Sequence, residues 1–114
     1  MSITFACFDV ETTSLDSKKG HVIEIAVVRI ADGGEVLKEW TSLINANTED
    51  LGRPDIHGIT LEMLEGAPTF LEVAGDLISE LSGCIPVAHN ASFDQKFILS
   101  EWANSGLGPL QLEV

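Results

Sequence analysis

The sequence predicts an α/β fold in which helices pack against a mixed β-sheet. Three strand-like stretches rich in β-branched and aromatic residues occupy the first half of the chain, with polar or glycine-rich stretches between them. The second half has two stretches with apolar residues at helical spacing and a short apolar stretch between them. This order fits the 114 residues as one small domain or a portion of one.

The first three strands are expected to form an antiparallel meander. Residues 3–9 form the first predicted strand, and residues 12–20 follow as a polar loop. Residues 22–31 are an apolar run typical of a strand buried on both faces. Residues 32–34, Asp-Gly-Gly, predict a hairpin turn that returns the chain into a third strand over 35–44.

The helical part begins after a long irregular segment over 45–58. A short helix is predicted over 60–64. A longer one starts at Thr69, because Thr69 and Glu72 have the spacing of a capping box, and Gly83 suits its C-terminal cap. Six apolar residues at helical spacing form its predicted buried stripe: Phe70, Val73, Ala74, Leu77, Ile78 and Leu81.

A fourth strand is predicted over residues 84–89. Ser92 and Gln95 repeat the capping-box spacing, so a last helix is expected to begin there and to end near Gly106. Its inward residues are predicted to be Phe93, Phe97 and Ile98.

Composition restricts the class of protein. A hydrophobic content of 45% indicates a globular core rather than disorder. No apolar run is long enough to span a bilayer, and the first ten residues do not resemble a signal peptide. Cys7 and Cys84 lie in apolar stretches and are expected to be buried free thiols, which favours the cytoplasm.

The charge balance is unusual for a protein that binds nucleic acid. Six basic and eighteen acidic residues give a formal net charge of −12. Proteins that hold nucleic acid through charge are normally basic. Either nucleic acid is not the partner, or cations bound at the site supply the positive charge.

Three acidic residues follow strand-like stretches in a pattern that indicates a metal site. Asp9 and Glu11 are two residues apart and share one face of the first strand, and Asp94 falls in the first turn of the last helix. If the first and fourth strands are parallel neighbours, the three carboxylates converge and repel one another. Two Mg²⁺ or Mn²⁺ ions would remove that repulsion. Taken singly, Asp94 would complement the helix dipole and Asp9 would be a turn residue.

The segments around these acids resemble the motifs of the DEDD superfamily of 3′–5′ exonucleases, DEDDh type. The resemblance is greatest to the branch with the proofreading epsilon subunit of bacterial DNA polymerase III. FDVETTSL (8–15) resembles the first motif and HNASFDQKFIL (89–99) the second. Three more segments match in the same order: VIEIAVV (22–28), HGIT (57–60) and APTFLEV (67–73).

The resemblance implies a ribonuclease H-like fold with a three-stranded antiparallel meander, a parallel strand and flanking helices. It implies an enzyme that hydrolyses phosphodiester bonds at the 3′ end of single-stranded DNA or RNA. The catalytic metal ligands fall on Asp9, Glu11 and Asp94. A DNA polymerase subunit is the protein partner that the resemblance implies, and no membrane is involved.

Four residues fall on the family's substrate positions. Thr12 would hold the terminal nucleotide, and Leu15 would wedge against the terminal bases. His57 and Ile59 would flank the terminal sugar and base. Core packing is the alternative for Leu15 and Ile59.

Two departures from the family pattern matter. Ser14 stands where the family usually has glycine. The third motif, a helix with His-x4-Asp that supplies the general base and a fourth metal ligand, is missing, since no histidine follows His89. Residues 1–114 are therefore expected to be the N-terminal portion of an exonuclease domain, C-terminally truncated, without its fifth strand and final helices.

Three explanations for the missing motif stay open: truncation, completion by another chain, or a degenerate site. The chain as given is expected to be inactive or weakly active as an exonuclease. The alternative is a non-catalytic module that contacts a polymerase or nucleic acid. Without a fifth strand and its following helix, residues 84–89 would form a sheet edge, and apolar surface near Phe93, Phe97 and Ile98 would be left uncovered. The chain is expected to self-associate through the edge or the uncovered face, or to need a partner that supplies the missing strand.

Overall fold

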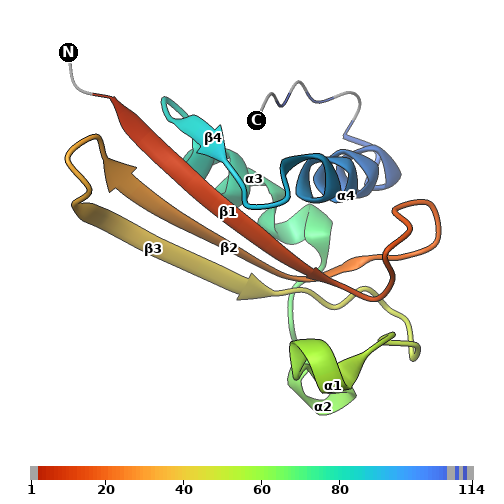
Figure 1. The fold of residues 1–114 in the computed structure, drawn as a ribbon. Coiled ribbons are helices and arrows are strands. Elements are labelled where there is room, and N and C mark those ends of the chain that lie inside the picture. Colours follow the sequence, from red (N-terminus) through yellow and green to blue (C-terminus); the bar gives the residue numbers. More distant parts are fainter. Residues whose placement is uncertain (1–2, 108–109, 111, 113–114) are drawn as a thin grey trace.

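The computed structural model describes residues 3–107, 110 and 112, and its centre is a mixed four-stranded sheet (Figure 1). The strands lie in the order β3-β2-β1-β4. The first three form an antiparallel meander, and β4 runs parallel to β1. The strand bounds are β1 Thr4–Thr12, β2 Val22–Ala31, β3 Val36–Leu43 and β4 Ile85–Val87. The mixed α/β sheet predicted from the sequence is confirmed.

Two long helices pack on the sheet, and two single-turn helices lie past the end of β3 (Figure 1). Helix α3 contacts β2, and α4 contacts both β1 and β2. The helix bounds are α1 Pro54–His57, α2 Leu61–Leu64, α3 Phe70–Leu81 and α4 Ala91–Asn104. Within the described residues, no helix is long and apolar enough to cross a membrane.

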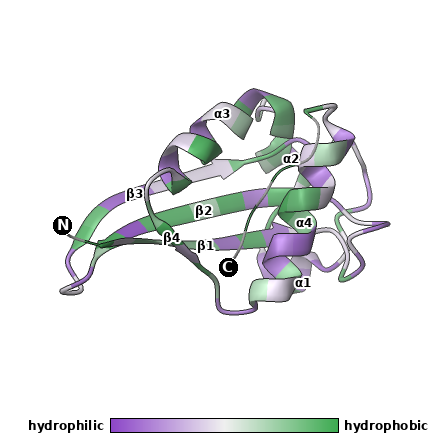
Figure 2. Cartoon of the chain, turned by 90° about the horizontal axis from the view of Figure 1, so that it is seen from above, coloured by the Kyte–Doolittle hydropathy of each residue, from purple (hydrophilic) through white to green (hydrophobic). Residues whose placement is uncertain are grey.

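The main core lies between one face of the sheet and the two long helices. Figure 2 shows the apolar stretches of β1 and β2 running beneath α3 and α4. The sheet contributes alternate residues of β1, because successive side chains point to opposite faces. The most deeply buried members are Ala6, Phe8, Val22, Ile25, Val27, Ile44, Phe70, Ala74, Leu77, Phe97 and Ile98. A smaller cluster lies under α1 and α2 and consists of Ile23, Leu51, Ile59 and Leu64.

The predicted turn and two predicted helix starts are confirmed. Gly34 has φ of +94°, and its N–H donates to the carbonyl of Ala31 at 2.8 Å, closing the hairpin between β2 and β3. Thr60 caps α2 by accepting from the N–H of Met63. A reciprocal capping box between Thr69 and Glu72 starts α3.

The predicted start of the last helix is wrong. Helix α4 begins at Ala91, and within the described chain the Asn90 side chain makes no capping hydrogen bond. The Gln95 side chain does not complete a capping box, because its amide donates to the carbonyl of Leu112. A tertiary contact therefore replaces the local one that the spacing suggested.

Several strand expectations need correction. Strand β1 continues to Thr12 rather than ending at residue 9, because its pairing with β2 extends to Val22. Strand β4 is shorter than predicted. Only the first part of β2 is deeply buried, and the residues from Val28 on are half-buried. The segment predicted to be irregular contains α1, which begins at Pro54, a residue suited to the first helical position.

Two expectations about exposed and buried groups also differ from the structure. Cys7 and Cys84 are free, as predicted, but half-buried rather than buried. The apolar surface of α4 was expected to be uncovered, yet Phe97 is 1% exposed and Ile98 is fully buried. Leu112 is buried in the same core and helps to cover it.

Strand β4 is one of the two edge strands of the described sheet, the other being β3. Ile85 is 47% exposed and Val87 is 39% exposed, so this edge carries accessible apolar side chains. Self-association through it stays a prediction, since unpaired apolar edges favour pairing with another strand.

Candidate active site

Three acidic side chains come together where β1 extends past the end of β4. Strand β4 pairs with β1 only over Phe5–Cys7, whereas β1 pairs with β2 as far as Thr12. Asp9 and Glu11 lie on this extension, two residues apart and so on one face. The expected parallel pairing of the first and fourth strands is confirmed.

Asp94 is brought to the same place by α4, which begins shortly after β4. Its side chain is buried, and the residue is only 3% exposed. Burial, followed by the negative charge of Asp9, raises the pKa of Asp94 to about 6, and Glu11 adds to the effect. The Val10 backbone opposes this shift and lowers the pKa of Asp94, because it favours the ionised carboxylate.

Glu11 is also an acid whose pKa is raised by its surroundings. Its pKa is raised by burial first, then by Asp9 and by Glu24, which stands opposite it on β2. His57 lowers the pKa of Glu11 but does not cancel the rise. The neighbouring loop is held by hydrogen bonds between His21 and Thr13 rather than by Glu24.

The acid cluster formed by Asp9, Glu11 and Asp94 is suited to a hard divalent cation. Its donors are carboxylate oxygens, the ligands that Mg²⁺ and Mn²⁺ prefer. Burial first and the neighbouring acids second raise the pKa of Glu11 and Asp94, so a cation bound there would favour their ionised forms. Across residues 3–107, 110 and 112, no group of three His, Cys, Asp or Glu side chains is already spaced as metal ligands. The donor chemistry fits a cation, which would draw the carboxylates closer.

A cleft of about 220 Å³ opens beside Glu11 and holds three of the four predicted substrate residues. Thr12, Leu15 and His57 line it. Ile59 does not, because it is 2% exposed and packs in the smaller core cluster, as the core-packing alternative requires. The full lining is Val10, Glu11, Thr12, Thr13, Ser14, Leu15, Arg53, Ile56, His57 and Phe93.

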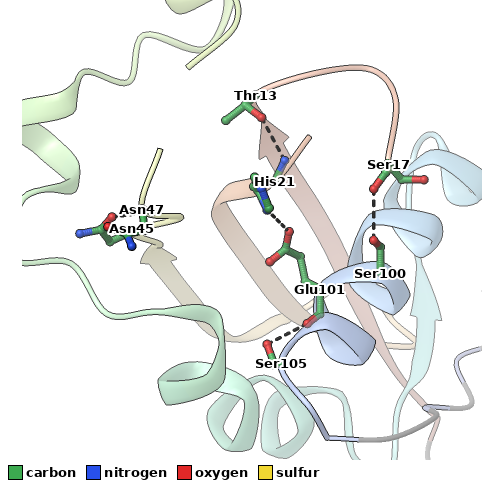
Figure 3. A network of polar contacts seen from close by, with 8 residues as sticks. All are labelled: Thr13, Ser17, His21, Asn45, Asn47, Ser100, Glu101 and Ser105. Atoms are coloured by element: carbon green, nitrogen blue, oxygen red, sulfur yellow. Dashed lines mark hydrogen bonds and ion pairs between the residues drawn. The ribbon is translucent and has the colours of Figure 1, made fainter. Parts of the chain in front are cut away.

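One wall of the cleft is the loop between β1 and β2, which polar side chains fasten to β2 and α4. The hydroxyl of Thr13 accepts from the N–H of His21 at 3.0 Å, and the His21 ring bonds to Glu101 of α4 at 3.0 Å (Figure 3). The Ser100 hydroxyl donates to the carbonyl of Ser17 at 3.1 Å (Figure 3). This fastened loop presents Leu15, which is 87% exposed. The exposure contradicts core packing for Leu15.

The facing wall is the segment around α1. Gly52 has φ of +75°, and a Cβ there would lie 1.9 Å from the carbonyl oxygen of Thr13, so the two walls touch backbone to backbone. His57 stabilises this wall from within. Its Nδ1 accepts from the N–H of Ile59 at 2.9 Å, so Nε2 is the donor to the carbonyl of Leu51 at 2.7 Å.

Arg53 is a cleft residue that sequence reasoning missed. Its guanidinium makes a two-bond fork with Asp55, at 3.0 and 2.8 Å, which orients it on the wall opposite Glu11. The pKa of Asp55 is lowered by this bond. The signal was available, since Arg53 lies four residues before the HGIT motif in a chain with six basic residues.

Comparisons with known proteins identify the family and the fold. The family model of the RNase_T exonucleases matches residues 6–106. The chain belongs to this exonuclease family. The DEDD exonuclease resemblance found in the sequence is thereby confirmed.

Members of known sequence include PolC-type DNA polymerases III. This chain is 41% identical to the Thermotoga petrophila polymerase over 106 residues, which cover 92% of this chain and 8% of the polymerase. It is 37% identical to the Bacillus subtilis polymerase over 101 residues, covering 83% and 7%. The chain thus spans under a tenth of these relatives' length.

Solved structures with this fold include exonuclease I. The enzyme from Methylocaldum szegediense matches with a TM-score of 0.79 at 16% identity, over 90% of this chain and 24% of that one. E. coli exonuclease I in complex with a dT13 oligonucleotide matches with a TM-score of 0.76 at 15% identity, over 90% and 24%. These likenesses confirm the predicted ribonuclease H-like fold.

Proposed function

We propose that residues 1–114 form the metal-binding and nucleotide-binding portion of a 3′–5′ exonuclease domain of the proofreading type. The observation that carries the proposal is the uncompensated acid cluster beside a cleft whose fastened loop exposes Leu15. The substrate would be the 3′ end of single-stranded DNA. Family membership supports the reaction class, and the similarity to PolC-type polymerases supports a DNA polymerase as partner.

The metal ligands would be Asp9, Glu11 and Asp94. Two bound Mg²⁺ or Mn²⁺ ions would supply charge neutralisation and an activated water at the scissile phosphodiester. The chain's own contribution is to hold three acids whose charges oppose one another until a cation binds. Bound cations would also explain how a protein with a formal net charge of −12 binds a polyanion.

The cleft residues would position the terminal nucleotide. Thr12 stands next to Glu11 on the strand, and its hydroxyl donates to the Ser14 carbonyl at 2.8 Å, which shapes the loop that carries Leu15. Leu15 would rest against the terminal base, because a large apolar side chain at 87% exposure is costly without such a contact. His57 would contact the terminal sugar from the facing wall, and Ile59 would support His57 through its backbone N–H.

A positioned general base is the component these residues lack, because no histidine follows His89 in the sequence. Such a base typically contributes about 10²–10⁴-fold, so we propose weak hydrolysis by residues 1–114 alone. The second candidate function is a module that binds a single strand or a polymerase without cleaving. The three acids that repel one another favour the enzyme, because a module that only binds has no use for them.

Binding and cleavage of a 5′-labelled single-stranded oligonucleotide test the proposal. We expect divalent-dependent binding that prefers a single-stranded 3′ end over the same end placed in a duplex. We expect slow shortening from the 3′ end that Glu11→Gln abolishes. Binding without any shortening would select the non-cleaving module, and binding that ignores both the metal and the 3′ end would refute the proposed function.

A further inference from the structure

A second hollow adjoins the cleft, and two residues line both of them. This outer hollow measures about 180 Å³. Leu15 and Phe93 line both the cleft and the outer hollow, so they form a ridge between the two. The outer hollow is lined by Leu15, Ser17, Ser92, Phe93, Lys96 and Phe97.

The walls of the outer hollow are held in place. Ser17 is tied to α4 through its carbonyl, which accepts from the Ser100 hydroxyl at 3.1 Å (Figure 3). The rings of Phe93 and Phe97 pack against each other with centroids 4.9 Å apart and tilted by 52°. A chain crossing the ridge would therefore meet a preformed surface, which lowers the ordering cost of binding.

Lys96 gives the outer hollow its charge. It is exposed on α4, and no acid among the described residues pairs with its ammonium group. By contrast, Lys38 pairs with Glu80 and Arg53 with Asp55. The hydroxyl side chains of Ser17 and Ser92 stand on the same lining and are donors suited to phosphate oxygens.

We propose that the outer hollow is a phosphate subsite for the nucleotide upstream of the terminal one, with Lys96 as its cation. The inference rests on the proposed function, because it takes the terminal nucleotide to lie in the cleft beside Glu11. The strand would cross the ridge of Leu15 and Phe93 and place its next phosphate at Lys96. In a chain of net charge −12, an unpaired lysine that lines a hollow beside the cleft gives a phosphate a local cation.

The test compares Lys96→Gln with Lys19→Gln. Lys19 is an exposed lysine of the adjoining loop and lines neither hollow, so its variant makes the same change in charge. Binding of a 5′-fluorescein oligothymidylate is followed by anisotropy in Ca²⁺ at several salt concentrations. For Lys96→Gln we expect Kd to rise about threefold to fivefold at low salt, and the log–log salt slope to fall by about 0.7. Thymidine 5′-monophosphate, measured by competition, should bind both variants and the parent equally.

The outcomes separate the two levels of the inference. Equal binding of the oligothymidylate by Lys96→Gln and the parent would overturn the subsite while leaving the proposed function intact. A larger loss of oligothymidylate affinity with Lys19→Gln would indicate that the strand runs along the loop, and would also overturn the subsite. A parent chain that binds no single strand would refute the proposed function itself. Unchanged thermal melting of Lys96→Gln shows that a loss of affinity is not a loss of folding.

Discussion

The two ends of the sheet bury carboxylates in opposite ways. At one end, Glu80 of α3 is 5% exposed and bonds to Lys38 of β3. At the other end, Asp94 of α4 is 3% exposed and faces Asp9 and Glu11, with no ion pair to it among the described residues. A buried charge is costly unless paired, so the first arrangement is a structural solution. The second leaves its negative charge available to a ligand.

Removing the partner of the structural acid should destabilise the fold. Lys38→Met leaves the Glu80 carboxylate buried without its cation. Because the Lys38 side chain is 55% exposed and solvent screens the pair, we expect a loss of about 2 kcal/mol in the free energy of unfolding. Urea denaturation measures it. Lys38→Met/Glu80→Leu should recover most of the loss, and Lys19→Met on the exposed loop should change stability by less than about 0.5 kcal/mol. An unaffected Lys38→Met would mean that Glu80 is neutral in the folded state.

At the other end of the sheet, a divalent cation should neutralise the acid cluster, as the Lys38 ammonium neutralises Glu80. Mn²⁺ that binds only the folded chain should add about 2.7 kcal/mol at a concentration a hundredfold above Kd. Thermal melting during a Mn²⁺ titration measures the gain. The Asp9→Ala/Asp94→Ala variant should show none, and an equal gain in that variant would place the ion elsewhere.

Without divalent ions, neutralising the unpaired acid should stabilise the fold. The pKa of Asp94 rises from an ordinary 3.8 to about 6 on folding, so the folded state binds more protons. Its contribution to stability is full below pH 3.8 and is lost as the pH rises through about 6. At pH 8, Asp94→Asn should therefore be more stable than the parent by about 2 kcal/mol. At pH values below 3.8 the difference should vanish, and a variant less stable at pH 8 would contradict this account.

A third buried acid, Glu101, should give the smallest effect. It is 7% exposed and bonds to His21, whose side chain is 41% exposed, so solvent screens the pair. We expect His21→Gln to cost about 1 kcal/mol in thermal unfolding. The backbone of His21 bonds to Thr13, and the His21 ring ties that backbone to α4 through Glu101, so the loop with Leu15 should show faster amide hydrogen exchange in this variant. Unchanged exchange would show that Ser17 and Ser100 suffice to hold the loop.

The sequence predicted what depends on local patterns and on the family motifs. The capping box of Thr69 and Glu72 is formed by neighbours in the chain, and the parallel pairing that brings Asp94 to Asp9 follows from the fold. Contacts between distant residues were not predictable in the same way. Gln95 lies three residues after Ser92, as in a capping box, but its side chain bonds to Leu112. Glu80 falls outside the predicted apolar stripe of its helix, yet it is buried against Lys38.

The candidate site shows the same division. Asp9, Glu11, Thr12 and Leu15 come from one contiguous motif, and the structure places them around one cleft and its acid cluster. The closeness of Arg53 to the HGIT motif was visible in the sequence, but its place in the cleft depends on how the α1 segment packs beside β1. Ile59 was assigned by its place in a motif, although its side chain belongs to the small core.

The contact between Gly52 and the Thr13 carbonyl has a consequence for how this cleft can evolve. The spacing of the two walls is set by main-chain atoms, with a Cβ at position 52 reaching to 1.9 Å of the oxygen. Side chains that line the walls can therefore change without altering the width between them. Mutations at the lining positions should diversify which base is preferred, while position 52 should accept glycine alone. A library randomised at position 52 and at the lining positions would separate the residue that sets the width of the cleft from those that set its base preference.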